Sequence, residues 1–310
     1  MMKSIYSILL ISVAISISGH GDMGSIPFKK TVRITEPNQD AIIAWNGKEQ
    51  LLYLQTTLAA SEETKVLEVM PLPNKPTVDE AKPEVFKRCQ SLLPKVRVEY
   101  ESGGKAGPFS APLAPPAANV VERKLIGAHD IRIVELIDAK RFSAWVTTEF
   151  GTENKDLEIP APLLEVIDEY VKDGYKWFLF DVVDLKQEAA KKTPLKIRFK
   201  TDKLYYPMRI TRTEKGGTKV SLSILTNILF DKEDAIGISR ESFKVPSSPV
   251  DITGAQVKWI DPSIYELLGQ PQQVKLRTWE ISGEIDSFKK DLLIRNPVTA
   301  KKEAAPVKPQ

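Results

Sequence analysis

Histidine and cysteine, which serve in most nucleophilic and metal sites, are nearly absent from this chain of 310 residues. The sequence has two histidines, His20 and His129, and one cysteine, Cys89. A Ser-His-Asp or Cys-His site would have to use His129. This residue lies in a short Gly-Ala-His-Asp segment between two strand-like runs, where a solvated turn residue is expected. Cys89 falls on the apolar stripe of a short predicted helix, which favours a buried, inert thiol over a nucleophile or an intermolecular link.

Motifs for metals and phosphates are also missing. The sequence contains no CxxC, HExxH or P-loop pattern. The segment Asp231-Lys232-Glu233-Asp234 places three carboxylates in four residues, and hard oxygen ligands of this kind bind Ca²⁺. Its spacing does not match an EF-hand, however, so a solvated turn is expected. We therefore assign no cofactor, no metal ligand and no catalytic residue from motifs.

Acidic residues leave one other route to catalysis, because a pair of carboxylates can hydrolyse a glycosidic bond without histidine or cysteine. Four acids lie at predicted strand ends or beside aromatic residues: Glu36, Asp40, Glu68 and Asp181. The chain has 41 acidic residues, so the sequence cannot select a pair from them. Three aromatic residues could stack on sugars but are expected to pack in the core or on an edge strand: Trp45, Tyr205 and Tyr206.

The elements that would position these residues begin with a β-meander over residues 32–76. Asn46-Gly47 lies between two strand-like runs, and both residues tolerate positive φ, so the pair predicts a type I′ hairpin. A third strand at 66–70 ends at Pro71, which lacks the N–H that would continue a ladder. Later helices and strands are expected to add to this one sheet.

The rest of the chain mixes helix and strand patterns without a regular order. Apolar spacing predicts helices at 83–92, 138–150, from Pro160 or Pro162 to Gly174, and at 263–268. Apolar runs predict strands at 96–100, 120–125, 131–137, 175–183, 195–200, 205–213, 219–230 and 273–282. The run 175–183 reads as a central strand, and Gly216-Gly217 is expected to turn the pair 205–213 and 219–230. We expect an α+β fold with mainly antiparallel sheet or sheets and a few short helices packed on one side.

Residues 1–19 predict a cleaved signal peptide and therefore an exported protein. Lys3 is their only charge, and the apolar run at 5–17 is too short for a bilayer, which needs roughly 20 residues. Small residues precede a cleavage point at Gly19, and an uncleaved N-terminal anchor is the alternative. No later stretch reaches membrane length. The mature chain is thus expected to be periplasmic or extracellular, without a stable transmembrane anchor.

Residues 20–295 form the predicted body, and residues 296–310, rich in Pro, Ala and Lys, form a predicted disordered tail. Residues 102–119 contain three Gly and four Pro, which predict a flexible loop that could separate sub-domains 20–101 and 120–295. Basic and acidic residues are equal in number within the body. This balance gives no electrostatic footprint for nucleic acid.

Several segments, taken in order, are similar to a known family. The run VRITEPNQDAIIAWNGKEQLLYLQTTL is followed by VLEVMPLPNKPTVDEAKPEVF, by an Asp-Ala helix with a central Trp145, and by PLLEVIDEYVKDGYKWFLFDV and PLKIRFKTDKLYYPMRIT. Over roughly residues 20–230 the chain resembles the secreted bacterial family catalogued as domain of unknown function 2330. The resemblance implies export and an α+β domain, and it implies no chemistry.

Two functions from different classes are compatible with these features. The first is a non-enzymatic binding or envelope-associated module whose partner is an envelope protein or glycan. The second is a carboxylate-based hydrolase that acts on envelope polysaccharide. A concave cleft that holds two acids with pKa values pushed apart would favour the hydrolase.

Overall fold

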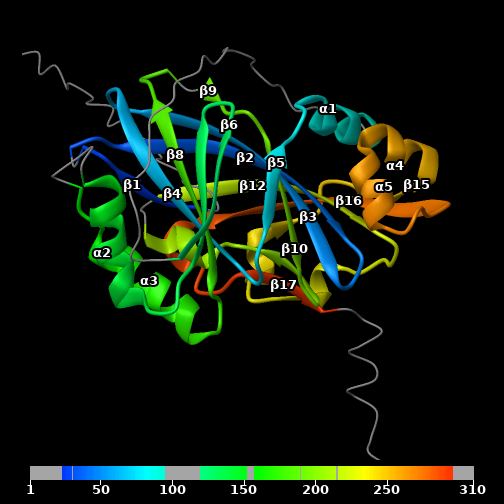
Figure 1. Ribbon diagram of the computed structural model, residues 1–310. Helices are drawn as coiled ribbons and strands as arrows, with labels where there is room; N and C mark the ends of the chain where they lie inside the picture. The colour runs from blue at the N-terminus through cyan, green and yellow to red at the C-terminus, as the bar shows by residue number, and fades with distance from the viewer. Residues whose placement is uncertain are drawn as a thin grey trace, which may run out of the picture.

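Alternating apolar residues make strands the main elements of this chain, and the computed structural model arranges them in three sheets (Figure 1). The structure describes residues 23–29, 31–94, 119–151, 157–188, 190–213 and 216–295. A five-stranded sheet has the order β1 (Gly24–Pro27), β4 (Thr64–Leu72), β8 (Trp177–Leu185), β7 (His129–Glu135) and β6 (Asn119–Ile126).

A nine-stranded sheet forms the second large layer. Its path runs through β14 (Phe243–Lys244), β16 (Gln273–Glu284), β12 (Gly217–Thr226), β2 (Ile34–Trp45), β3 (Glu49–Ala60), β10 (Leu195–Lys200) and β5 (Thr77–Glu80). Two short strands, β15 (Val250–Thr253) and β9 (Ala190–Lys191), pair with β16 and β3. A small third sheet has the order β11 (Lys203–Tyr206), β17 (Leu292–Arg295) and β13 (Ala235–Ile236).

The two large sheets pack on each other through a central core. Along β4, Met70 and Leu72 face this core, while Leu67 and Val69 face the other way. Side chains from the nine-stranded sheet, such as Ile43, fill the core from the opposite side. The alternation follows from the period of two in a strand, and it fixes which residues of each strand can meet between the sheets.

Helices cover the outer face of each large sheet (Figure 1). On the five-stranded sheet lie α2 (Ala139–Phe150) and α3 (Ala161–Lys172). On the nine-stranded sheet lie α1 (Glu84–Ser91), α4 (Gly254–Ile260) and α5 (Pro262–Leu267). Four 3₁₀ turns complete the described elements: η1 (Arg209–Thr213), η2 (Lys232–Asp234), η3 (Arg240–Ser242) and η4 (Ile285–Ser287).

The expected α+β class is confirmed. Every pairing between described strands is antiparallel except that of β2 with β12. The predicted helices correspond to α1, α2, α3 and α5, and each large sheet has its helices on one face. The predicted central strand is β8, which pairs with β4 on one side and β7 on the other.

The predicted meander is right in its first hairpin and wrong in its turn type and its third strand. β2 and β3 pair antiparallel around Asn46-Gly47. Within this turn only Gly47 has a positive φ (89°), whereas a type I′ turn needs positive φ at both central residues. The side chain of Asn46 instead accepts hydrogen bonds from the backbone N–H groups of Lys48 and Glu49. The third strand, β4, leaves this sheet and joins the five-stranded one.

Two later predictions also differ from the structure. The predicted strand 205–213 is the short strand β11 followed by η1, because a Pro at 207 interrupts the ladder. Gly216-Gly217 does not turn a hairpin between β11 and β12, because these two strands are not paired: β12 pairs with β16 and β2, and β11 pairs with β17. The predicted signal peptide, the strand at 96–100, residues 102–118 of the loop and the tail at 296–310 lie outside the described residues.

Candidate functional site

Two of the four singled-out acids meet in the central core. Glu68 on β4 and Asp181 on β8 are direct cross-strand partners. Each lies on the strand face that carries Met70 and Leu179, so both carboxylates point toward the nine-stranded sheet. Glu68 is 1% exposed and Asp181 is 0% exposed. The sequence identified both residues, and only the strand pairing brings them together.

His129 completes this arrangement and corrects a prediction. It is the first residue of β7, on the same face as Ile131 and Ile133, and it is 2% exposed rather than solvated. Nδ1 lies 2.5 Å from Oδ2 of Asp181, and Nε2 lies 2.8 Å from the carbonyl oxygen of Thr193. A carboxylate and a carbonyl both accept, so both ring nitrogens must donate, and the imidazole is protonated.

Electrostatics support the charged form of His129. Burial by itself would lower the pKa of His129, but the Asp181 carboxylate outweighs burial and raises that pKa above its ordinary value. Burial would likewise raise the pKa of Asp181, yet the charge and hydrogen bond of His129 hold it below its usual range. The two residues therefore form an ion pair between the sheets.

Lys192 adds a fourth charged group. It follows β9 on the side of the nine-stranded sheet, and its Nζ forms a short ion pair with Oε2 of Glu68. Burial raises the pKa of Glu68 in spite of this partner. Oδ1 of Asp181 has no hydrogen-bond partner among the described residues. We call Glu68, His129, Asp181 and Lys192 the buried charge cluster.

The buried charge cluster has the chemistry of an acid–base pair without the access that a substrate needs. Burial raises the pKa of Glu68, while His129 lowers that of Asp181, a separation that is typical of catalytic carboxylates. No substrate can reach groups that are 2% exposed or less. Two surface pockets are lined by other residues: Glu63, Lys186, Gln187 and Glu188 line one, and Gly47, Lys48, Pro73, Asn74, Lys200, Thr201 and Asp202 line the other.

The remaining singled-out acids do not join the cluster. Asp40 on β2 lies on the opposite face from Ala41 and Ile43, and burial raises its pKa while Lys191 and Lys219 oppose the shift. The side chain of Glu36 is outside the part that the structure describes.

The three aromatic residues pack inside, as expected. Trp45, Tyr205 and Tyr206 are buried. Trp45 Nε1 donates to the carbonyl of Thr201, and the Tyr205 hydroxyl donates to that of Pro71. These rings hold the central core and are not available to stack on sugars.

Neither of the other two candidates forms a reactive site. Cys89 is buried on the inner face of α1, as expected, and burial raises the pKa of its thiol to about 12. Asp231 and Asp234 cap each other across η2, because the Asp231 N–H donates to Asp234. Within the described ranges, no group of three or more His, Cys, Asp or Glu side chains could hold a metal ion.

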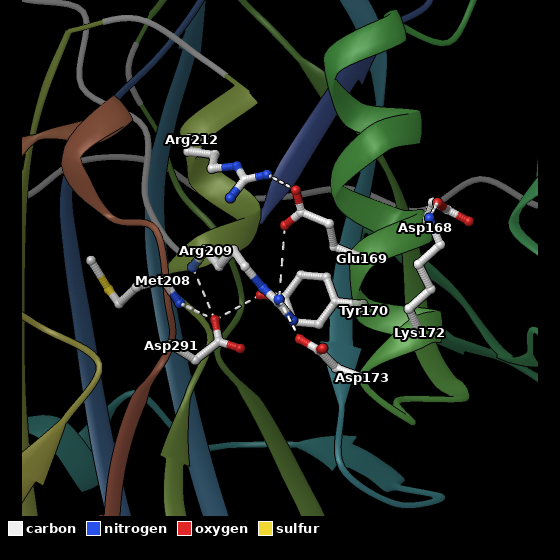
Figure 2. Close-up of polar contacts among 9 residues, drawn as sticks. All are labelled: Asp168, Glu169, Tyr170, Lys172, Asp173, Met208, Arg209, Arg212 and Asp291. Carbon is white, nitrogen blue, oxygen red and sulfur yellow. Dashed lines mark hydrogen bonds and ion pairs between the residues drawn. The ribbon is translucent and has the colours of Figure 1, made fainter.

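A second polar network, which the sequence did not indicate, joins α3 to η1 and to the residue before β17 (Figure 2). Oδ1 of Asp291 accepts three hydrogen bonds, from the Tyr170 hydroxyl (2.6 Å) and from the N–H groups of Met208 (3.0 Å) and Arg209 (2.9 Å). The Arg209 guanidinium lies 3.9 Å from the centre of the Tyr170 ring and donates to Asp173 at 2.5 Å.

This polar network has a structural role. Asp291 and Tyr170 are buried, and burial raises the pKa of both. At its rim, Arg212 pairs with Glu169 of α3 (Figure 2). The contacts tie the outer helical layer to the small third sheet.

No helix in the described portion of the chain is both long and apolar enough to cross a membrane.

Comparisons with known proteins give a family and little else. No curated protein matches the chain. A mutated baculovirus P35 after caspase cleavage is 11% identical over 83% of this chain and 91% of that chain, with a TM-score of 0.32. P35 in a caspase-8/P35 complex is 11% identical over 84% and 90%, with a TM-score of 0.33. TM-scores this low do not establish a shared fold or a shared function. The family DUF2330, described as an uncharacterized protein conserved in bacteria, matches residues 24–269, and the chain belongs to this family.

Proposed function

We propose that this protein is an exported, non-enzymatic binding module of the bacterial cell envelope. The observation that carries the proposal is the closure of the buried charge cluster: Glu68, His129 and Asp181 are the groups best suited to acid–base chemistry, and each is at most 2% exposed. Export is supported by Lys3 and the short apolar run at 5–17.

The contacts of the cluster support a mechanical role. His129 and Asp181 belong to the five-stranded sheet, while Thr193 and Lys192 lie beside the nine-stranded sheet. The ion pairs and hydrogen bonds therefore join the two layers. A catalytic group must come within hydrogen-bond reach of its substrate. The side chains of the buried charge cluster instead form their hydrogen bonds and ion pairs within the protein.

The surface pocket beside the β2–β3 hairpin is the candidate binding surface. Its lining combines the ammonium groups of Lys48 and Lys200, the amide of Asn74 and the carboxylate of Asp202. Such a mixture of donors and acceptors suits the hydroxyl, amide and carboxylate groups of an envelope glycan or of a peptide attached to it.

A hydrolase that acts on envelope polysaccharide is the second candidate. One observation favours it, namely that Glu68 and Asp181 are adjacent and that their pKa values move in opposite directions. A glycosidase also needs its two carboxyl groups on either side of the scissile bond. In this fold both carboxyl groups would have to be uncovered before a sugar could enter between them.

One experiment separates the two candidates. The mature chain is incubated with isolated peptidoglycan sacculi, and both co-sedimented protein and released soluble sugar are measured. We expect co-sedimentation without sugar release, weakened at least threefold in the charge-reversal variant Lys200→Glu and unchanged in Glu68→Gln if that variant folds. Sugar release by the parent that disappears in folded Glu68→Gln would establish the hydrolase instead.

Export has its own test. Mass spectrometry of the protein purified from its natural compartment is expected to place the mature N-terminus between Gly19 and Asp22. An intact Met1 on a cytoplasmic product would contradict export without affecting the binding assay.

A further inference from the structure

The five tryptophans of the chain differ in how far a ligand can reach them. Three of them are buried: Trp45, Trp145 and Trp279. Trp259 on α4 is 49% exposed. Trp177, the first residue of β8, is partly buried and packs against the central core. A large, flat indole ring with a free face is a contact surface for a ligand, so Trp177 and Trp259 are the two tryptophans to consider.

Trp177 lies next to the surface pocket beside the β2–β3 hairpin. Its cross-strand partner on β4 is Leu72, and the next two residues of the chain, Pro73 and Asn74, line that pocket. Directly opposed residues in an antiparallel pair have Cβ atoms about 4.5–5.5 Å apart. Nδ2 of Asn74 donates to the carbonyl oxygen of Lys200, at the end of β10, at 3.0 Å. One loop therefore holds the tryptophan and the pocket side by side.

The ammonium group of Lys75 covers the ring of Trp177. Nζ lies 5.8 Å from the ring centre, close to the limit of about 6 Å for a cation–π contact. The side chain of Lys75 is exposed. A contact that is long and open to water is weak, so a ligand with an apolar face can take the place of the ammonium group over the ring.

We propose that Trp177 is the stacking platform for a sugar ring of an envelope glycan, and that the polar groups of the neighbouring pocket bind the hydroxyl groups of the same glycan. This inference rests on the proposed binding function and narrows its ligand, because that function admits both a glycan and a peptide attached to it. In the bound state the sugar ring replaces Lys75 over the indole.

The groups around Trp177 match the two kinds of surface that a sugar has. One face of a sugar ring carries C–H groups that pack on an aromatic ring, and its rim carries hydroxyl groups that donate and accept hydrogen bonds. Lys48 and Lys200 supply donors in the pocket, and Asp202 supplies an acceptor. Glu135, the cross-strand partner of Trp177 on β7, supplies a second carboxylate beside the ring.

A peptide fits this surface less well. Peptide recognition uses apolar pockets for side chains or an open strand edge for the backbone. Among the described residues that line the pocket, Pro73 is the only one with an apolar side chain. The strands that frame the pocket, β3 and β10, are each paired on both sides. The surface thus offers a peptide neither kind of anchor.

Peptidoglycan glycan strands from which an amidase has removed the peptides are the probe that tests this assignment. Titration calorimetry measures the Kd of the mature chain for these strands. We expect Trp177→Ala to raise the Kd about tenfold, as the loss of a stacked ring predicts. The matched control is Trp259→Ala, because Trp259 is exposed and also lies beside a cation, Arg88 at 5.5 Å, but does not line the pocket. This control should bind like the parent.

Tryptophan fluorescence provides a readout that a purely structural role of Trp177 would not change. A sugar that stacks on the indole alters the emission of that ring. We expect the glycan strands to change the emission spectrum of the parent and of Trp259→Phe, and to leave that of Trp177→Phe unchanged. Trp177→Phe keeps a ring in the core contact, so it serves as the test if Trp177→Ala does not fold. Circular dichroism confirms the fold of each variant.

The outcomes separate this inference from the proposed function. Binding to intact sacculi that is lost when the peptides are removed would overturn the sugar platform and leave the binding module standing. The same holds if the strands bind but folded Trp177→Ala matches the parent, or if Trp177→Phe keeps the fluorescence change. A parent that binds neither intact sacculi nor stripped strands would overturn both.

Discussion

Replacing His129 by alanine tests the role of the buried charge cluster. The substitution removes the donor to Asp181 Oδ2 at 2.5 Å and the donor to the Thr193 carbonyl at 2.8 Å. Oδ1 of Asp181 already lacks a partner among the described residues. The variant would therefore hold the Asp181 carboxylate in the core beside Glu68 without its counter-charge.

The size of the effect follows from this geometry. Removing one partner of a buried ion pair costs about 3–5 kcal/mol, because the other charge is left uncompensated. In a domain of this size that loss lowers the melting temperature by roughly 6–20 °C. A solvated turn histidine would change the free energy of unfolding by no more than about 0.5 kcal/mol.

Urea denaturation of the parent, His129→Ala, Asp181→Asn and the double variant measures the effect as a double-mutant cycle. We expect the double variant to be less destabilised than the sum of the single variants, because each single change leaves the other residue unpaired. The control is Lys172→Ala, which breaks an exposed pair with Asp168 and should cost little. A loss under about 1 kcal/mol for His129→Ala, or additive single effects, would refute the ion pair.

Four further outcomes are expected. The free energy of unfolding should fall as pH rises through the raised pKa of His129. The stabilisation by the protonated ring is fully present below the ordinary histidine pKa of about 6.5, and it is lost when the ring loses its proton in the folded state. Urea denaturation at several pH values measures this change. Tyr170→Phe should cost about 1–3 kcal/mol by removing one of three donors to Asp291, and a thermal melt that matches the parent would contradict this. Gly47→Val should cost about 1–3 kcal/mol because Gly47 has φ 89°, and a cost under about 0.5 kcal/mol in urea would mean that the turn tolerates a side chain. Cys89 should resist alkylation at neutral pH until the protein is unfolded, and labelling of the native protein would show an accessible thiol.

Residue types at element ends explain which parts of the fold the sequence predicts. α3 begins after Pro160 and ends before Gly174, whose φ of 89° is the left-handed conformation that glycine adopts readily. β8 is recognisable because it is apolar on both faces, as expected for a strand whose sheet is covered on both faces.

Two of the elements that were not predicted correctly show different reasons for the failure. α4 was missed although Thr253 and Gln256 form a capping box, which is a signal that the sequence contains. The departure of β4 to another sheet has no local signal, because its alternation is the same whichever strands it joins. Only packing against β1 and β8 decides its place.

In the candidate site, too, the sequence contains a signal for one residue and none for another. His129 was placed in a turn, yet the alternation of Ile133 and Ile131, continued by two residues, reaches His129 and predicts an inward side chain. Lys192 could not have been found, since its contact with Glu68 spans 124 residues and depends on how two sheets pack.

The protonation state of His129 tests the central claim, that the charge cluster is closed, most directly. Long-range ¹H–¹⁵N spectra of the imidazole ring are practical because the chain has two histidines, and His20→Ala identifies the other signal. We expect both ring nitrogens of His129 to carry protons at neutral pH, to exchange slowly with water, and to lose a proton only above the ordinary pKa of about 6.5. A ring that titrates near that ordinary value and exchanges rapidly with solvent would mean that the cluster is open, and would contradict the non-enzymatic account.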